Sequence, residues 1–141
     1  GGLPEFLDAL QEQQTPVAIA TTAELANVRF YFEHFGLGRW FQPGRVVYQD
    51  GSFPGKPNPA IYRRAAAALD KRPEECLVFE DSGAGITAAR QAGCGAIACV
   101  APADSSRCLA AFPFLKASIP DFRQRDFLLS LLQAPALTAA D

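Results

Sequence analysis

A chain of 141 residues is long enough for one domain with a hydrophobic core of useful size. Its formal net charge is −2, and charges of both signs are scattered along it, which argues against a nucleic-acid track or an anionic membrane surface as partner. No apolar stretch is long enough to span a bilayer, and the first residues lack the basic and apolar regions of a signal peptide. We therefore expect neither a nucleic-acid nor a membrane partner.

The first third of the chain predicts alternating helices and strands. Leucine and phenylalanine at helical spacing predict a helix over about residues 3–10, and the apolar run 17–21 predicts a short buried strand. An aromatic-rich helix is expected over about 24–35, where Gly36 stops it. A further strand is expected over 45–48, before a loop rich in glycine and proline.

The same alternation continues beyond that loop. Asn58 is suited to cap a helix whose first position is Pro59. The elements expected after this helix are a strand over 76–79, a helix over 85–92 ended by Gly93, a strand over 96–101, a short extended piece over 118–120 and a helix over 127–132. This order predicts an α/β fold: a three-layer, mostly parallel, Rossmann-like sheet with helices on both faces. We expect one domain over residues 1–133 and a frayed tail over 134–141.

The cysteines suggest a reducing compartment. Cys76, Cys94, Cys99 and Cys108 show no Cys-x-x-Cys spacing, and three of them lie in or beside apolar runs. A thiol in such surroundings behaves as a small hydrophobe. We therefore expect all four to be reduced residues of the core in a cytoplasmic protein.

The segment 76–86 carries the strongest functional signal. A fully apolar run ends in two adjacent carboxylates, Glu80 and Asp81, and a glycine-rich turn follows. Carboxylates are costly at the end of a buried strand unless a cation meets them, and their oxygens suit a hard ion such as Mg²⁺. The alternative is a solvated acidic turn that closes an ordinary strand.

Other polar residues also follow predicted strands. Thr21 and Thr22 follow the first strand, Lys56 stands in a rigid loop after the next, and Ser82 opens a helix whose free amides favour anions. In a parallel sheet the carboxyl ends of the strands meet at one edge, where ligands bind. Together with the two carboxylates, these groups predict a site that handles phosphate.

These motifs resemble the haloacid dehalogenase superfamily of phosphohydrolases, in the capped branch that includes beta-phosphoglucomutases and phosphoglycolate-type phosphatases. Residues 17–22 are similar to its second motif, residues 55–59 to its third and residues 79–86 to its fourth. The resemblance covers nearly the whole chain.

The resemblance implies a role for each matching residue. Thr21 would hydrogen-bond the transferring phosphoryl group, and Lys56 would neutralise charge between nucleophile and phosphate. Asp81, helped by Glu80, would hold Mg²⁺, and Asn58 would order the lysine loop. We also count Thr22, Asn58 and Ser82 as phosphate- or substrate-binding. The complete enzyme would be a Mg²⁺-dependent phosphatase or phosphomutase that acts on a small phosphorylated metabolite through an aspartyl-phosphate.

The chain departs from the family at the first motif, Asp-x-Asp-x-Thr, whose leading Asp is the nucleophile. No Asp-x-Asp occurs in this sequence, and the start of the chain resembles the segment that follows the cap. We therefore expect a fragment of a longer protein, or a truncated relative that binds without turnover. Either would be inactive alone.

Three other functions are possible. Gly83-x-Gly85-x-x-Ala88 after a strand, with Asp104 beyond it, matches a dinucleotide fingerprint and would indicate an oxidoreductase. The two carboxylates between strand and glycines argue against it, because they would repel a pyrophosphate. A signalling receiver domain combines similar residues in a different chain order. A non-catalytic binding or scaffold protein built on this half-fold is the third.

In the resembled fold the nucleophile strand lies between the strand ending at Thr21 and the strand ending at Glu80. Its loss would leave two inner edges with exposed Val17, Ile19, Leu77 and Phe79. Unpaired strand edges invite association. We expect either that these strands pair directly, or that a strand from another chain or from a missing N-terminal segment fills the place between them.

Overall fold

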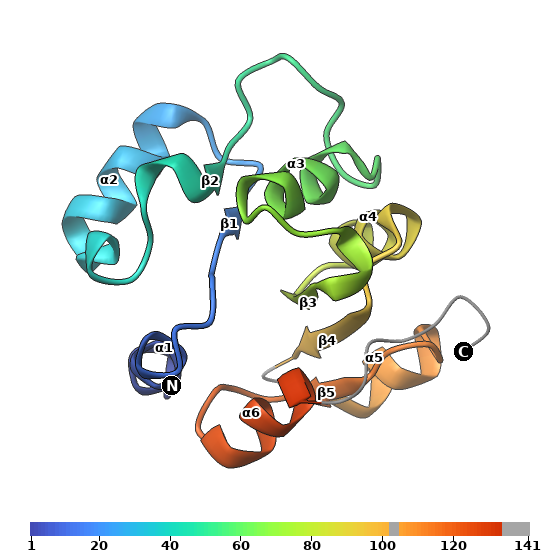
Figure 1. Ribbon diagram of the computed structural model, residues 1–141. Helices are drawn as coiled ribbons and strands as arrows, with labels where there is room; N and C mark the ends of the chain where they lie inside the picture. The colour runs from blue at the N-terminus through green and yellow to red at the C-terminus, as the bar shows by residue number, and fades with distance from the viewer. Residues whose placement is uncertain (102–104, 134–141) are drawn as a thin grey trace.

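The computed structural model describes residues 1–101 and 105–133, so Asp104 and the tail 134–141 lie outside the described residues. The strands are β1 (Ile19–Ala20), β2 (Val46–Val47), β3 (Leu77–Glu80), β4 (Ala96–Val100) and β5 (Ala117–Ile119). The helices are α1 (Leu3–Glu12), α2 (Leu25–Phe35), α3 (Ala60–Ala68), α4 (Gly83–Ala92), α5 (Ser105–Ala111) and α6 (Arg125–Gln133), with short 3₁₀ turns at Leu37–Arg39, Pro43–Arg45 and Pro73–Glu75. Figure 1 shows these elements in place.

Both faces of strand β4 are covered by packed apolar residues. Ile97 and Cys99 pack with residues of α3 and α4. Ala98 and Val100, which point the other way, pack with residues of α1 and α6. A strand buried on both faces needs no polar alternation, which is why its sequence is an unbroken apolar run. The predicted three-layer α/β architecture with helices on both faces is confirmed (Figure 1).

The strands form two parallel ladders instead of one continuous sheet. One ladder joins β1 to β2, and the other has the order β3-β4-β5. Among the residues that the structure describes, no ladder joins β1 to β3. The alternative in which these two strands close up and pair directly is therefore wrong for this chain, and an apolar pocket borders both strands instead.

The predicted boundaries hold where a local stop signal exists. Gly36 ends α2 and Gly93 ends α4, each with a positive φ that favours glycine. Ser82 caps α4 by accepting a hydrogen bond from the Gly85 amide at 3.0 Å. Helix α5, by contrast, is absent from the prediction, since no strong helical period marks residues 105–111.

The expectation of four reduced cysteines is wrong. Cys99 on β4 and Cys108 on α5 form a disulfide, with 6.7 Å between their Cα atoms. Helix α5 returns along β4 and β5 and so brings Cys108 beside Cys99, a closeness that cysteine spacing alone did not reveal. Cys76 and Cys94 are free thiols. The disulfide removes the cysteine argument for a cytoplasmic location, because such bonds are rare in reducing compartments.

The helices of residues 1–101 and 105–133 are too short or too polar to cross a membrane.

Candidate functional site

A polar pocket opens where β1 and β3 end. Its volume is about 540 Å³, and two alanines and a phenylalanine line it together with the polar residues Thr21, Thr22, Lys56, Glu80, Asp81 and Ser82. We call it the strand-end pocket. Residues far apart in the chain meet here because the residues that follow β1, those that follow β3 and the loop before α3 all border the same space. Six of the seven side chains singled out in the sequence are thus brought together.

Glu80, the last residue of β3, lies at the floor of this pocket and is only 6% exposed. Its Oε2 atom accepts from Lys56 Nζ at 2.8 Å and from the Tyr62 hydroxyl. Its Oε1 atom accepts from the Asp81 amide, the Ser82 amide and the Ser82 hydroxyl at 3.1–3.3 Å. A buried carboxylate is tolerated only when it is paired and hydrogen-bonded in this way.

The same contacts determine the ionisation of this group. Burial by itself raises the pKa of Glu80, but the hydrogen bonds from Lys56 and Tyr62 and the Lys56 charge outweigh burial and hold the pKa below its ordinary value. Burial and the neighbouring carboxylate raise the pKa of Tyr62 well above its ordinary value. Tyr62 therefore stays protonated and donates to an ionised Glu80.

Tyr62 is the site residue that sequence reasoning missed. It lies in α3, six positions after Lys56, and is buried among apolar residues. The lysine ammonium is 5.2 Å from the centre of its ring. A signal was present, because a tyrosine on the buried stripe of a helix needs a partner for its hydroxyl.

Gly85 provides the space that the carboxylate occupies. A Cβ atom on Gly85 would come closer than 3.0 Å to three atoms of the Glu80 carboxyl group. The glycine-rich turn is therefore required by the fit between α4 and Glu80, and not by an unusual backbone angle at Gly85.

The loop that carries Lys56 is tied together locally. The Asn58 amide donates to the Gly55 carbonyl at 3.0 Å, and the Asn58 side chain accepts from the Ala60 amide at 2.9 Å. Asn58 thereby closes the lysine loop just before α3. The predicted cap is displaced by one residue, because Pro59 is the N-cap and Ala60 the first residue of the helix. Its exposed side chain does not line the strand-end pocket, so the structure places it apart from the other six predicted residues.

Thr21 is held on the opposite wall. Its amide continues the β1–β2 ladder by donating to the Val47 carbonyl at 2.9 Å, and its hydroxyl accepts from the Ala23 amide at 3.1 Å. Because the hydroxyl oxygen is already an acceptor, its hydrogen is left to be donated. Across the pocket the first turn of α4 presents the positive end of a helix dipole. Both features favour an anion.

The pocket supplies only part of a magnesium shell. The oxygens of Glu80 are taken up by protein donors, so the carboxylate available to a metal ion is that of the exposed Asp81. Within the described ranges no three His, Cys, Asp or Glu side chains are grouped so that they could hold a metal ion. Mg²⁺ usually takes one or two carboxylates plus phosphate oxygens and water, so Asp81 fits as one ligand of an otherwise external shell.

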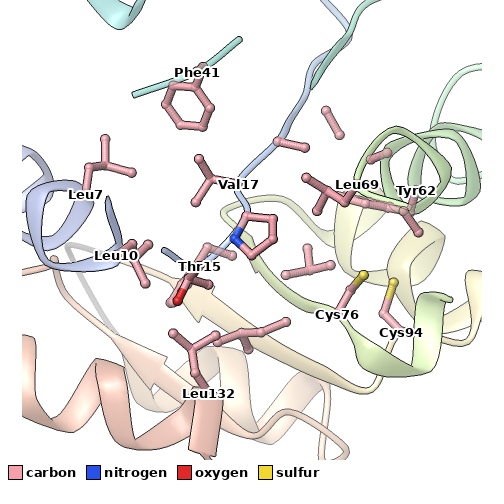
Figure 2. A pocket seen from close by; sticks show the side chains of 18 of the residues that line it. Leu7, Leu10, Thr15, Val17, Phe41, Tyr62, Leu69, Cys76, Cys94 and Leu132 are labelled. Atoms are coloured by element: carbon pink, nitrogen blue, oxygen red, sulfur yellow. The ribbon is translucent and has the colours of Figure 1, made fainter. Parts of the chain in front are cut away.

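Behind the strand-end pocket an apolar pocket of about 250 Å³ separates the two ladders. We call it the inter-ladder pocket, and Figure 2 shows Leu7, Leu10, Val17, Phe41 and Leu132 around it. Val17, Ala18 and Ala20 line it on the β1 side, and Leu77, Val78 and Phe79 on the β3 side. The two facing strand edges therefore border apolar space instead of one another.

Comparison with protein-family models matches residues 1–93 to the haloacid dehalogenase-like hydrolases. Hexitol phosphatase A of Escherichia coli strain K12 is 35% identical over 106 residues, which are 75% of this chain and 48% of that protein. Fructose-1-phosphate phosphatase YqaB of the same strain is 37% identical over 82 residues, which are 58% of this chain and 43% of that protein. Thus the chain spans less than half the length of these two relatives.

Solved structures agree with the fold. A HAD hydrolase of family IA, variant 3, from Entamoeba histolytica superimposes with a TM-score of 0.84 at 28% identity, covering 94% of this chain and 60% of that one. These matches favour the phosphohydrolase interpretation over the dinucleotide one.

Proposed function

Because the chain belongs to the haloacid dehalogenase-like hydrolase family, we propose that it forms the phosphate-binding part of a phosphatase or phosphomutase for a small phosphorylated sugar. The observation that carries the proposal is the convergence of Thr21, Thr22, Lys56, Asp81 and Ser82 in one pocket at the carboxyl ends of parallel strands. The relatives named for hexitol phosphate and fructose 1-phosphate support the substrate class.

In the proposed reaction each described residue stabilises charge at the phosphoryl group. An aspartate carboxylate from outside this chain attacks phosphorus, and the bond to the sugar oxygen breaks. The second aspartate of the same Asp-x-Asp motif gives its proton to the leaving oxygen and afterwards takes one from the attacking water. Water then hydrolyses the aspartyl-phosphate to free phosphate. The Lys56 ammonium, the Thr21 hydroxyl and the start of α4 would meet the phosphoryl oxygens throughout. A bound Mg²⁺ would add positive charge beside Asp81.

The attacking carboxylate must come from outside this chain, since the sequence contains no Asp-x-Asp. We propose that an apolar strand carrying it occupies the inter-ladder pocket, parallel to β1 and β3. Its backbone would pair with the two facing edges, and its last residues would emerge in the strand-end pocket. A segment of a longer polypeptide would be the source of this strand. A second copy of the chain could fill the inter-ladder pocket, but it also lacks Asp-x-Asp and so could not supply the nucleophile.

We expect the Lys56 ammonium to supply most of the affinity for inorganic phosphate. Removing Lys56 alone would leave Glu80 as an unpaired buried charge, so the informative comparison is Lys56→Met with Glu80→Gln against Glu80→Gln alone. Calorimetric titration should show at least about tenfold weaker binding in the double variant, as expected for loss of a charged hydrogen bond. Lys116→Ala, at an exposed position elsewhere, is the control and should bind normally. Equal affinity of the single and double variants would contradict the proposal.

We expect the substitution Asp81→Asn to strengthen phosphate binding without metal and to weaken it when Mg²⁺ is present. Lys56 is paired with Glu80, and among the described residues of the pocket Asp81 is a carboxylate without an ion-pair partner. Asp81→Asn should therefore tighten metal-free phosphate binding severalfold and abolish the gain that Mg²⁺ gives the wild type. The same titration in the presence and absence of Mg²⁺ measures both effects. An unchanged Mg²⁺ gain would show that Asp81 is not a ligand.

A further inference from the structure

Three side chains from separate segments meet at the floor of the strand-end pocket. Glu80 ends β3, Lys56 stands in the loop before α3, and Tyr62 lies in α3 itself. Lys56 and Tyr62 donate to the same carboxylate atom, Oε2 of Glu80. Their side chains are nearly excluded from solvent, with 12% exposure at Lys56 and 6% at both Glu80 and Tyr62.

The Glu80 carboxylate has no acceptor position left for a further ligand. An ionised carboxylate offers about four lone-pair directions. Five protein donors from Lys56, Tyr62, Asp81 and Ser82 already point at them. A metal ion could bind this carboxylate only by displacing one of these five donors. The carboxylate is therefore built as an anchor for donors.

The Tyr62 hydroxyl fixes the position of the Glu80 carboxylate. Its ring is packed in the core beside Ile61 and Ile86, so the hydroxyl is presented from a rigid helix. A lysine side chain has four rotatable bonds, and it holds one position only if its partner is fixed. We infer that Tyr62 is a positioning residue that acts through Glu80 to fix the Lys56 ammonium, and that Glu80 serves as this anchor instead of as a metal ligand.

The inference rests on the proposed phosphate site but can be tested without it. The chain has three lysines, Lys56, Lys71 and Lys116, and the last two are exposed. In ¹⁵N-lysine-labelled protein the Lys56 ammonium should give a slowly exchanging NMR signal, while those of Lys71 and Lys116 exchange with water too fast to be seen. If Lys56 also exchanges fast in the wild type, the inference is wrong, and no variant is needed to show it.

Tyr62→Phe removes the hydroxyl and keeps the ring. The Lys56 signal should then broaden beyond detection. The affinity for inorganic phosphate should fall about fivefold, which corresponds to the free energy of one hydrogen bond. Tyr31→Phe, which removes the same hydroxyl from an exposed position on α2, is the matched control and should change neither. A sharp, wild-type Lys56 signal in Tyr62→Phe would overturn the inference.

The two proposals fail separately. If wild-type protein binds no phosphate while the Lys56 signal depends on Tyr62, the proposed function fails and the positioning role stands. If phosphate binds and the Lys56 signal is indifferent to Tyr62, the positioning role fails alone. For Glu80, Mn²⁺ titration in the presence of phosphate distinguishes anchor from ligand. Glu80→Gln should keep Mn²⁺ broadening of the pocket amides, and loss of that broadening would assign Glu80 to the metal.

Discussion

Replacing Gly85 by alanine should destabilise the protein by about 3 kcal/mol, although alanine is by far the better helix former. The added Cβ would come closer than 3.0 Å to the Glu80 carboxyl group, which cannot move without losing Lys56 and Tyr62. Overpacking in a core costs about 1–3 kcal/mol, and disrupting a buried ion pair costs about 3–5 kcal/mol. Urea unfolding followed by circular dichroism measures the difference.

Gly83→Ala is the matched control, because Gly83 lies in the same first turn of α4. There the nearest atom to an added Cβ is the tip of the Phe112 ring at 3.4 Å, an ordinary contact. The free energy of unfolding should stay within about 0.5 kcal/mol or rise slightly. If both alanine variants are equally stable, the Glu80 carboxylate is not confined as described.

The chain alone should hydrolyse an aryl phosphate such as p-nitrophenyl phosphate in Mg²⁺ only at the background rate. Positioning and charge stabilisation are present, but the covalent step has no nucleophile. Sustained turnover that Asp81→Asn abolishes would contradict this expectation, because another carboxylate would then have to attack.

A separate peptide that carries the missing nucleophile strand should restore hydrolysis. The probe is a synthetic peptide, Lys-Lys-Val-Ile-Leu-Phe-Asp-Leu-Asp-Gly-Thr, which joins an apolar run to the family's first motif. We expect it to occupy the inter-ladder pocket and to raise hydrolysis above background. A peptide with Asn in place of the first Asp should bind equally well and give no turnover, which separates binding from chemistry.

The thiols of Cys76 and Cys94 report occupancy of the pocket independently of turnover. Both line the inter-ladder pocket, and Figure 2 shows them beside Tyr62. Burial raises the pKa of Cys94 to about 12 and also raises that of Cys76, so labelling with N-ethylmaleimide is slow and can be followed by mass spectrometry at pH 8.5. Either peptide should slow it further. An unchanged labelling rate at millimolar peptide would contradict the strand proposal. If raising the protein concentration without peptide slows labelling, and light scattering then shows dimers, the occupant of the pocket is a second copy of the chain.

The strand-end chemistry was readable from the sequence because it is local. Neighbouring residues in the sequence indicate where each of these groups lies. Glu80 and Asp81 follow an apolar run, Lys56 stands in a rigid loop, and Thr21 follows a strand. Parallel strands then require those ends to meet, so the pocket itself could be predicted. The helix ends at Gly36 and Gly93 were likewise readable, since left-handed backbone favours glycine.

The functions of the individual groups within that pocket were decided by tertiary structure. The sequence suggested that Asp81, helped by Glu80, holds a metal ion, whereas burial divides the two carboxylates into a paired Glu80 and an exposed Asp81. Which donors reach Glu80 depends on how α3 packs on the strands, and no spacing rule reveals that Tyr62 is one of them. The Cys99–Cys108 disulfide depends in the same way on the return of α5.

The separation of the two ladders also needed the whole fold. Hydrophobic periodicity and composition identify residues 17–21 and 76–79 as buried strands, but they do not show which strands are neighbours in the sheet. Strand pairing depends on contacts between residues far apart in the chain, and in this structure β1 pairs with β2 while β3 pairs with β4. The sequence by itself therefore determined which polar residues follow the strands and line the strand-end pocket. Only the tertiary structure decided which of them are paired, which are exposed, and that an apolar pocket lies between the two ladders, because each of these depends on how distant segments pack together.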